Sequence, residues 1–147
     1  MNITVVTPYD SSNYGAFLQA YCLQQYLVSA GHSVTHIPTR PAEYVEALYF
    51  HRMPVTKKEK LIPGVYRRHT AYGKKKYELF SRAQKAFHVT EDLSDTELIV
   101  LGSDEIWNVK NPVFAASVFW GKINIPTISY AASVGDADEE TFRSFPD

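Results

Sequence analysis

The chain has 147 residues, a formal net charge of −1 and 45% hydrophobic residues, which suits one folded domain with a sizeable core. Its single cysteine excludes an intramolecular disulfide and a zinc site built on several cysteines. The balanced charge disfavours a general nucleic-acid-binding protein, and no apolar stretch approaches the ~18 residues of a membrane span.

The charge is unevenly distributed along the chain. Residues 40–88 carry 12 Lys and Arg against four Glu, a net charge of +8. Residues 89–147 carry three Lys and Arg against 11 acidic residues, a net charge of −8. The basic segment is either a solvated helical face or a surface for an anionic partner. Because the first residues lack the pattern of a signal peptide, we expect a cytoplasmic protein.

The first elements predict one strand–helix–strand unit. Residues 2–7 form a run of mostly branched side chains that predicts a buried strand. Residues 15–30 predict a helix that Gly31 ends, and residues 33–38 predict a second strand parallel to the first. The helix has no charged residue, so we expect burial on more than one of its sides and a core position for Cys22.

The middle of the chain predicts an insertion of helices and loop over about residues 40–95. Residues 41–50 are compatible with a short helix. Residues 74–87 predict a longer helix, because Tyr77, Phe80 and other apolar residues recur there at spacings of three and four.

The last third of the chain predicts two further strands, over residues 97–102 and 126–131. Between them, residues 113–120 suit a strand or a short helix, and residues 138–145 suit the start of a helix. The four strands predict a single α/β domain over residues 1–147, with a doubly wound, mostly parallel sheet and flanking helices.

Three polar segments follow strands of this sheet, namely residues 10–15, 102–108 and 129–135. Ligands of open parallel sheets bind outside the carboxyl ends of the strands, so these segments predict a binding site. The candidate ligand-binding residues within them are Asn13, Tyr14, Gly15, Gly102, Ser103, Asp104, Trp107 and Ser133.

Each segment has a binding role and a purely structural alternative. The start of the first helix can bind an anion through free N–H groups, or its polar residues can simply cap the helix. Asp104 can accept hydrogen bonds from sugar hydroxyls or act as a base. Trp107 can stack on a sugar ring or belong to the core. The five histidines show no metal spacing, so we expect no metal site, and no catalytic residue is assigned.

Three motifs in order give the chain a family resemblance. Residues 13–24, which include Asn-Tyr-Gly-Ala and Leu-Gln-Ala-Tyr, resemble the signature after the first strand of polysaccharide pyruvyl transferases. The run Gly-Ser-Asp-Glu-Ile-Trp-Asn over residues 102–108 is similar to a second signature of that family. The run Ser-Tyr-Ala-Ala-Ser-Val-Gly over residues 129–135 is similar to a third.

The resemblance implies an enzyme that transfers a pyruvyl group from phosphoenolpyruvate to hydroxyls of a glycan or a lipid-linked sugar, in exopolysaccharide biosynthesis. It implies the Rossmann-like half of a GT-B-like two-domain fold, with phosphoenolpyruvate as co-substrate and no cofactor. The C-terminal second domain is absent from these 147 residues, so we expect a missing domain or self-association to complete the cleft.

Two alternatives remain open at this point. One is a non-catalytic α/β module that binds a glycan or a protein partner through the same edge of the sheet. The other is a receiver-type signalling domain with Asp104 after the third strand, although such domains hold a metal with an acidic cluster and only Asp10 follows the first strand.

Overall fold

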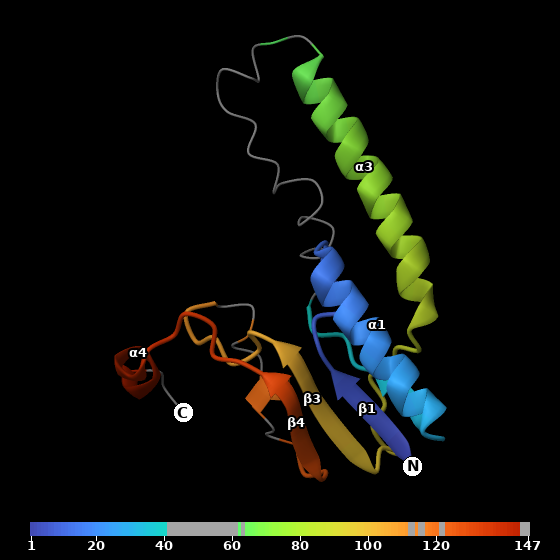
Figure 1. The fold of residues 1–147 in the computed structure, drawn as a ribbon, viewed down its shortest axis with the longest axis vertical. Helices are drawn as coiled ribbons and strands as arrows, with labels where there is room; N and C mark the ends of the chain where they lie inside the picture. Colours follow the sequence, from blue (N-terminus) through green and yellow to red (C-terminus); the bar gives the residue numbers. More distant parts are fainter. Residues whose placement is uncertain (41–61, 63, 112–113, 115–116, 121–122, 145–147) are drawn as a thin grey trace.

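The computed structural model describes residues 1–40, 62, 64–111, 114, 117–120 and 123–144 (Figure 1). Within them, four strands form one sheet in which every pair is parallel and the order is β2-β1-β3-β4. The strands are β1 (Asn2–Val6), β2 (Ser33–His36), β3 (Leu98–Asp104) and β4 (Thr127–Ala132). The predicted α/β class is therefore confirmed, and each predicted strand overlaps an observed one.

The central strand β1 is buried on both faces of the sheet. Every residue from Ile3 to Val6 is buried, because β1 lies between β2 and β3 and both of its faces are covered. Thr4 is 1% exposed, and its hydroxyl hydrogen-bonds the hydroxyls of Thr35 in β2 and Thr96 just before β3. A polar side chain in the middle of the sheet is thus satisfied by the two neighbouring strands.

Helix α1 (Tyr14–Ser29) covers one face of the sheet. Leu23 packs with Ile3, Val5 and Val100 in one buried cluster. The helix begins where Asn13 caps it, since the Asn13 Oδ1 accepts a hydrogen bond from the backbone N–H of Gly15 at 2.8 Å.

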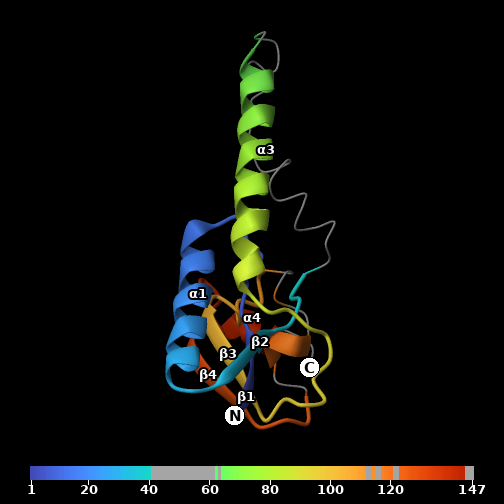
Figure 2. The same ribbon diagram turned by 90° about the vertical axis from the view of Figure 1, so that its right-hand side faces the viewer.

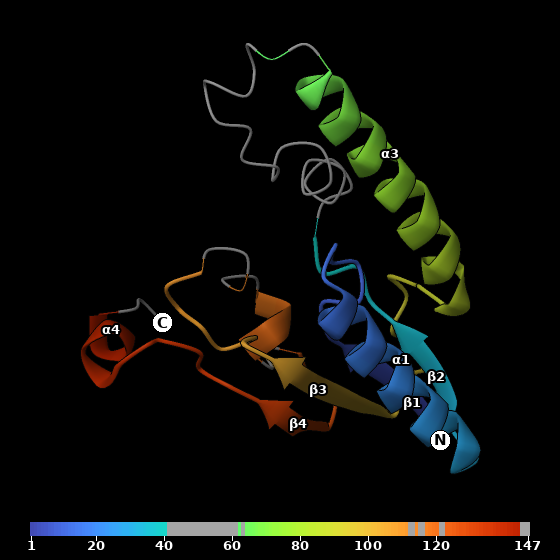
Figure 3. The same ribbon diagram turned by 45° about the horizontal axis from the view of Figure 1, so that its top comes forward.

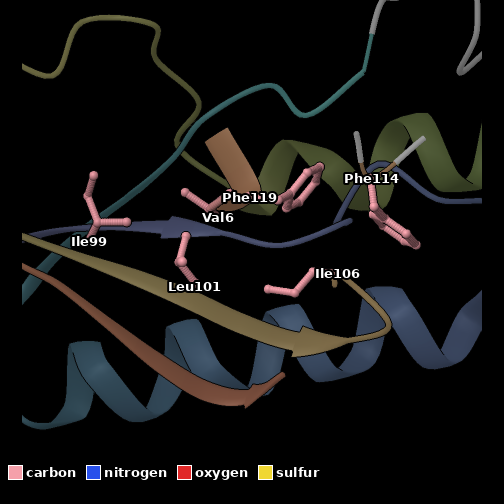
Figure 4. Close-up of a cluster of buried hydrophobic side chains, with 6 residues drawn as sticks. All are labelled: Val6, Ile99, Leu101, Ile106, Phe114 and Phe119. Carbon is pink, nitrogen blue, oxygen red and sulfur yellow. The ribbon is translucent and has the colours of Figure 1, made fainter. Parts of the chain in front are cut away.

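The opposite face of the sheet is covered by the chain that joins β3 to β4. The cluster there combines side chains from β1, β3 and this connection, which includes the 3-10 turn η4 (Ser117–Trp120) (Figure 4). Its buried members are Val6, Ile99, Leu101, Ile106, Phe114 and Phe119. Residues three apart in β1, Ile3 and Val6, therefore lie in different clusters, as the alternation of a strand requires.

Helix α3 (Val65–Ala83) rises from the sheet beyond the carboxyl ends of the strands (Figures 1 and 2). Its C-terminal part packs on α1 through aromatic rings, and the 3-10 turn η2 (Gln84–Ala86) follows it. Phe80, 4% exposed, lies 4.9 Å from the Tyr14 ring and 6.0 Å from the Phe17 ring, centroid to centroid. Phe87 continues this contact, with its ring 5.4 Å from that of Phe17.

Two predictions about the helices need correction, and a third holds in part. Helix α3 begins at Val65, nine residues before the predicted start, and Gly64 in a left-handed conformation is its N-cap. Helix α1 is covered by the sheet at Leu23 and by the Phe80 and Phe87 rings at Phe17, as the predicted cover on more than one side requires. Its remaining side is open, since Leu18 and Tyr26 are 56% and 70% exposed. Cys22 is exposed and is not a core residue, because it lies on the open side of α1.

The remaining helix, α4 (Glu139–Ser144), lies past β4 and away from α1 (Figure 3). It overlaps the predicted helix over residues 138–145. The predicted helix over residues 41–50 lies outside the described residues. Among the helices that the structure describes, none combines the length and the apolar character needed to cross a membrane.

Two of the three leucines of α1 give a matched test of its buried side. Leu23→Ala is expected to lower the free energy of unfolding by about 2–5 kcal/mol, because Leu23 is 8% exposed and packs on two strands. Leu18→Ala, 56% exposed on the same helix, is expected to cost less than about 0.5 kcal/mol. Urea unfolding followed by circular dichroism measures both values, and equal losses would contradict the assignment of the buried face.

Candidate functional site

The carboxyl ends of all four strands lie at one edge of the sheet because every pair is parallel. The three polar segments predicted from the sequence leave the sheet at this edge. In the order β2-β1-β3-β4, strands are added on one side of β1 and then on the other, so the topological switch point lies between β1 and β3. Ligands of doubly wound sheets bind at this point.

The second and third segments touch directly, and residues 104–108 with residues 133–136 are called the edge corner below. The Ser133 N–H donates to the Asp104 carbonyl at 3.0 Å, and the Trp107 N–H donates to the Ser133 carbonyl at 3.1 Å. These bonds extend the parallel pairing of β3 and β4 beyond the strands. The backbone of the edge corner is therefore fixed by the sheet itself.

Side chains connect the two halves of the edge corner as well. Asn108, 4% exposed, donates through Nδ2 to Glu105 Oε2 at 2.9 Å and to Asp136 Oδ1 at 2.8 Å. Gly135 sits against this pair, since a methyl group there would lie 2.6 Å from Asn108 Nδ2 and 2.7 Å from Glu105 Oε2. Its φ of +60° also favours glycine. Glycine thus lets the third segment approach the buried amide.

Asp104 has an unusual backbone conformation at the end of β3. Its φ is +83°, in the left-handed region that non-glycine residues rarely occupy. The Asp104 Oδ1 accepts a hydrogen bond from the N–H of the next residue, Glu105, at 2.9 Å, which stabilises this turn. The side chain is exposed at the edge, and within the described residues Oδ2 has no hydrogen-bond donor. One carboxylate oxygen is therefore free to accept a bond from a ligand.

The other predicted residues of these two segments have partly structural positions. Gly102 is buried, and a methyl group there would lie 3.0 Å from Leu23 Cδ2, so glycine permits close packing of α1 on β3. Trp107 is half-buried, and its Nε1 donates to the Phe119 carbonyl at 3.0 Å, which ties the indole to the core. Ser103 is half-buried, and Ser133 is exposed.

The first segment stands apart from the edge corner. Asn13, Tyr14 and Gly15 are exposed at the start of α1, but in the described part of the chain residues 10–15 form no hydrogen bond with the edge corner. Asn13 is occupied as the helix cap, and the Tyr14 ring packs on α3. The structure brings Asp104, Trp107 and Ser133 together but leaves Asn13, Tyr14 and Gly15 as a separate group at the same edge.

The structure adds a buried ion pair that the sequence analysis missed. Arg40, just beyond β2, lies with Nη1 3.5 Å from Asp10 Oδ1, and both side chains are at least nine-tenths buried. Burial raises the pKa of Asp10, while Arg40 and a hydrogen bond from Thr39 act in the opposite direction. Arg40 Nε has no acceptor among the described residues. This places a cation near the first segment, and the Asp10 carboxylate is already occupied by that cation.

His36, at the end of β2, is buried among aromatic rings, and its ring has no polar partner among the described residues. It is fully buried, and neither ring nitrogen has a hydrogen-bond partner within the part of the chain that the structure describes. Its ring packs against Phe87 at 4.7 Å and Tyr9 at 5.4 Å. Burial lowers the pKa of His36 to about 4, so the ring is neutral near pH 7.

The edge corner is acidic and hydroxyl-bearing. Asp104, Glu105 and Asp136 line it, and Lys110 is tied to it by a 2.7 Å bond from Nζ to the Asp136 carbonyl. Such a set of acceptors suits a neutral, hydroxyl-rich ligand more than an anion. Among the described residues, no three His, Cys, Asp or Glu side chains gather closely enough to hold a metal ion.

An apolar groove lies on the α1 face of the sheet, beside the edge corner. It has a volume of about 720 Å³ and runs between α1 and strands β3 and β4. Its lining includes Cys22 and Tyr26 from the helix and Ile128 and Tyr130 from β4. Because Ile128 and Tyr130 are more than half exposed, α1 leaves this part of the sheet uncovered.

Comparison with known proteins gives one match. A family model described as polysaccharide pyruvyl transferase matches residues 13–145, which contain the second and third polar segments and the last three residues of the first. No curated protein and no solved structure matches the chain, so the family model alone supplies the relationship.

Gly135 and Gly31 allow the geometry of the edge corner to be tested. Both have positive φ, so replacing either by Ala is expected to cost roughly 1–2 kcal/mol of stability. Gly135→Ala is expected to cost about 1 kcal/mol more, because its methyl group displaces Asn108 from its bonds, whereas nothing lies within 4 Å of a methyl group at Gly31. Faster amide exchange of Trp107 and Ser133 in the Gly135 variant alone would support this packing, and identical exchange in both variants would refute it.

The burial of His36 predicts a pH dependence of stability. Its pKa is about 4 in the folded chain and about 6.5 in the unfolded chain, so the folded state disfavours the proton. The free energy of unfolding therefore keeps its full value above about pH 6.5. It falls by about 3 kcal/mol in total as the pH is lowered from 6.5 to 4, because the unfolded chain binds the proton more readily. Denaturant midpoints measured across this range should fall in the wild type and in the exposed-site control His88→Phe, but fall less in His36→Phe. Parallel pH profiles for all three proteins would show that His36 is not the group responsible.

Proposed function

Because the chain belongs to the polysaccharide pyruvyl transferase family, we propose that it takes part in the transfer of a pyruvyl group from phosphoenolpyruvate to a glycan. In this reaction two sugar hydroxyl oxygens bond to C2 of phosphoenolpyruvate and the bond from C2 to the phosphate oxygen breaks. One hydroxyl proton goes to the methylene carbon, which becomes a methyl group, and the other leaves with the phosphate. The product is a cyclic ketal on the sugar.

The observation that supports this proposal is the composition of the edge corner. Asp104 offers a free carboxylate oxygen on a backbone fixed by β3 and β4, and Ser133 is exposed beside it. A carboxylate at this position suits a sugar hydroxyl, which is a hydrogen-bond donor. We therefore assign the sugar acceptor, free or lipid-linked, to the edge corner.

The donor needs a different environment. Phosphoenolpyruvate carries a phosphate and a carboxylate, and anions of this kind are bound by several cations or N–H donors. Arg40 is near the first segment, and the N-terminus of α1 adds a positive dipole end, but Arg40 already pairs with Asp10. We propose that a second domain of a GT-B-like fold, or a second copy of the chain, supplies the remaining cations. A cytoplasmic location and a role in exopolysaccharide biosynthesis are part of the same proposal.

Asp104→Asn tests the assignment of the acceptor. The protein is incubated with phosphoenolpyruvate and a panel of glycan acceptors, and released phosphate is compared with ketal-bound pyruvate. We expect Asp104→Asn to lower kcat/KM about tenfold or more, because it removes a charged hydrogen-bond acceptor. Asp92→Asn is the matched control, since Asp92 also accepts a bond from a nearby backbone N–H but lies before β3, away from the strand ends.

Two outcomes would contradict the proposal. Equal kcat/KM values for the Asp104 and Asp92 variants would remove Asp104 from the acceptor site. Glycan binding by the wild type without any release of phosphate would instead favour the non-catalytic binding module.

A further inference from the structure

Helix α3 presents a basic surface that the proposed function does not use. Its 19 residues contain six Lys and Arg against the single acid Glu78, a net charge of +5. The helix is about 28 Å long and projects beyond the strand ends, so much of its length stands clear of the sheet (Figures 1 and 2). A charge of this density on a projecting element is an electrostatic attraction site for an anionic partner.

The outward face of α3 has a regular pattern. Arg68, Lys75 and Arg82 are spaced seven residues apart, so they form one row along the helix. Tyr72 and Leu79, also seven apart, form the row beside it and are 55% and 48% exposed. These five residues are called the outer stripe.

The inward face of α3 fixes where the outer stripe points. Phe80, whose ring contacts Tyr14 and Phe17 of α1, is buried, and so is Gly73, which lies on the same face of α3 seven residues earlier. Lys76 is turned to the same side, with its Nζ 5.3 Å from the centre of the Tyr14 ring. Because this side is held by packing and by a cation–π contact, the outer stripe faces away from the body of the protein.

The charges of the outer stripe are unpaired. In the described ranges, none of Arg68, Lys75 and Arg82 takes part in an ion pair. The first turn of α3 does not offset these positive charges, since it contains no acidic residue and Gly64 provides no side-chain cap. Arg68 therefore adds positive charge close to the positive end of the helix dipole, and an anionic partner relieves this repulsion.

We propose that the outer stripe binds the surface of an anionic phospholipid bilayer. A helix that lies in such an interface combines basic residues with exposed aromatic and aliphatic side chains, which is the combination of Lys75, Tyr72 and Leu79. Anionic lipid headgroups attract each basic residue, and the two apolar side chains gain by entering the interface. A soluble polyanion would use the charges but would leave Tyr72 and Leu79 in water.

Vesicle co-sedimentation of the whole chain tests this inference. Vesicles of phosphatidylcholine alone are compared with vesicles that also contain phosphatidylglycerol, at low and high salt. We expect binding only to the anionic vesicles, with weaker binding at high salt. The triple variant Arg68→Glu, Lys75→Glu, Arg82→Glu should bind at least about tenfold more weakly. Lys75→Glu should also bind more weakly than Arg143→Glu, the same charge reversal on the exposed helix α4.

The double variant Tyr72→Ser, Leu79→Ser separates a bilayer from a soluble polyanion. It keeps all charges, so its retention on immobilised heparin should equal that of the wild type while its vesicle binding falls. Unchanged vesicle binding of this variant, or equal losses for Lys75→Glu and Arg143→Glu, would overturn the inference. So would absence of wild-type binding to anionic vesicles. Vesicle binding by a protein that transfers no pyruvyl group would support this inference and reject the proposed function separately.

Discussion

The parallel alignment of β1 with β3 is the constraint on which the rest of the structure depends. Both strands are buried on their two faces, so they can only exist with a helix on one side and the β3–β4 connection on the other. Because β1 and β3 are parallel, the segments that follow them leave the sheet at the same edge. The candidate site lies at this edge because the polar segments begin where the buried, apolar strands end.

The strands and the meeting of the second and third polar segments could be predicted because the signals are local. Runs of branched residues mark β1 and β3, and the polar residues that follow them belong to the same stretches of sequence. Once the strands are parallel, their ends meet without any further information. The contact of Asp104 with Ser133 follows from this rule, although nothing in the sequence indicates the left-handed backbone of Asp104.

Other features depend on residues that are far apart in the sequence, and these could not be predicted. The pairing of Asp10 with Arg40 joins two separate connections, so neither residue alone indicates it. The exposure of Cys22 depends on which side of an uncharged helix meets the sheet, and composition cannot distinguish the sides when both are apolar. The sequence predicts too late a start for α3, because the stretch before Lys74 lacks the apolar spacing by which a helix is recognised.

The position of β1 between its two neighbours also sets the order in which the chain can assemble. Thr4 meets Thr35 across 31 residues but meets Thr96 across 92 residues. Closing the larger loop costs only about 1 kcal/mol more in entropy, so the equilibrium is little affected, but long-range pairing is slow. We therefore expect the unit of β1, α1 and β2 to form before β3 pairs with β1, which leaves one side of β1 unpaired in the interval. During that interval, the bare hydrogen-bonding groups of β1 are the point at which a nascent chain is most exposed to mispairing.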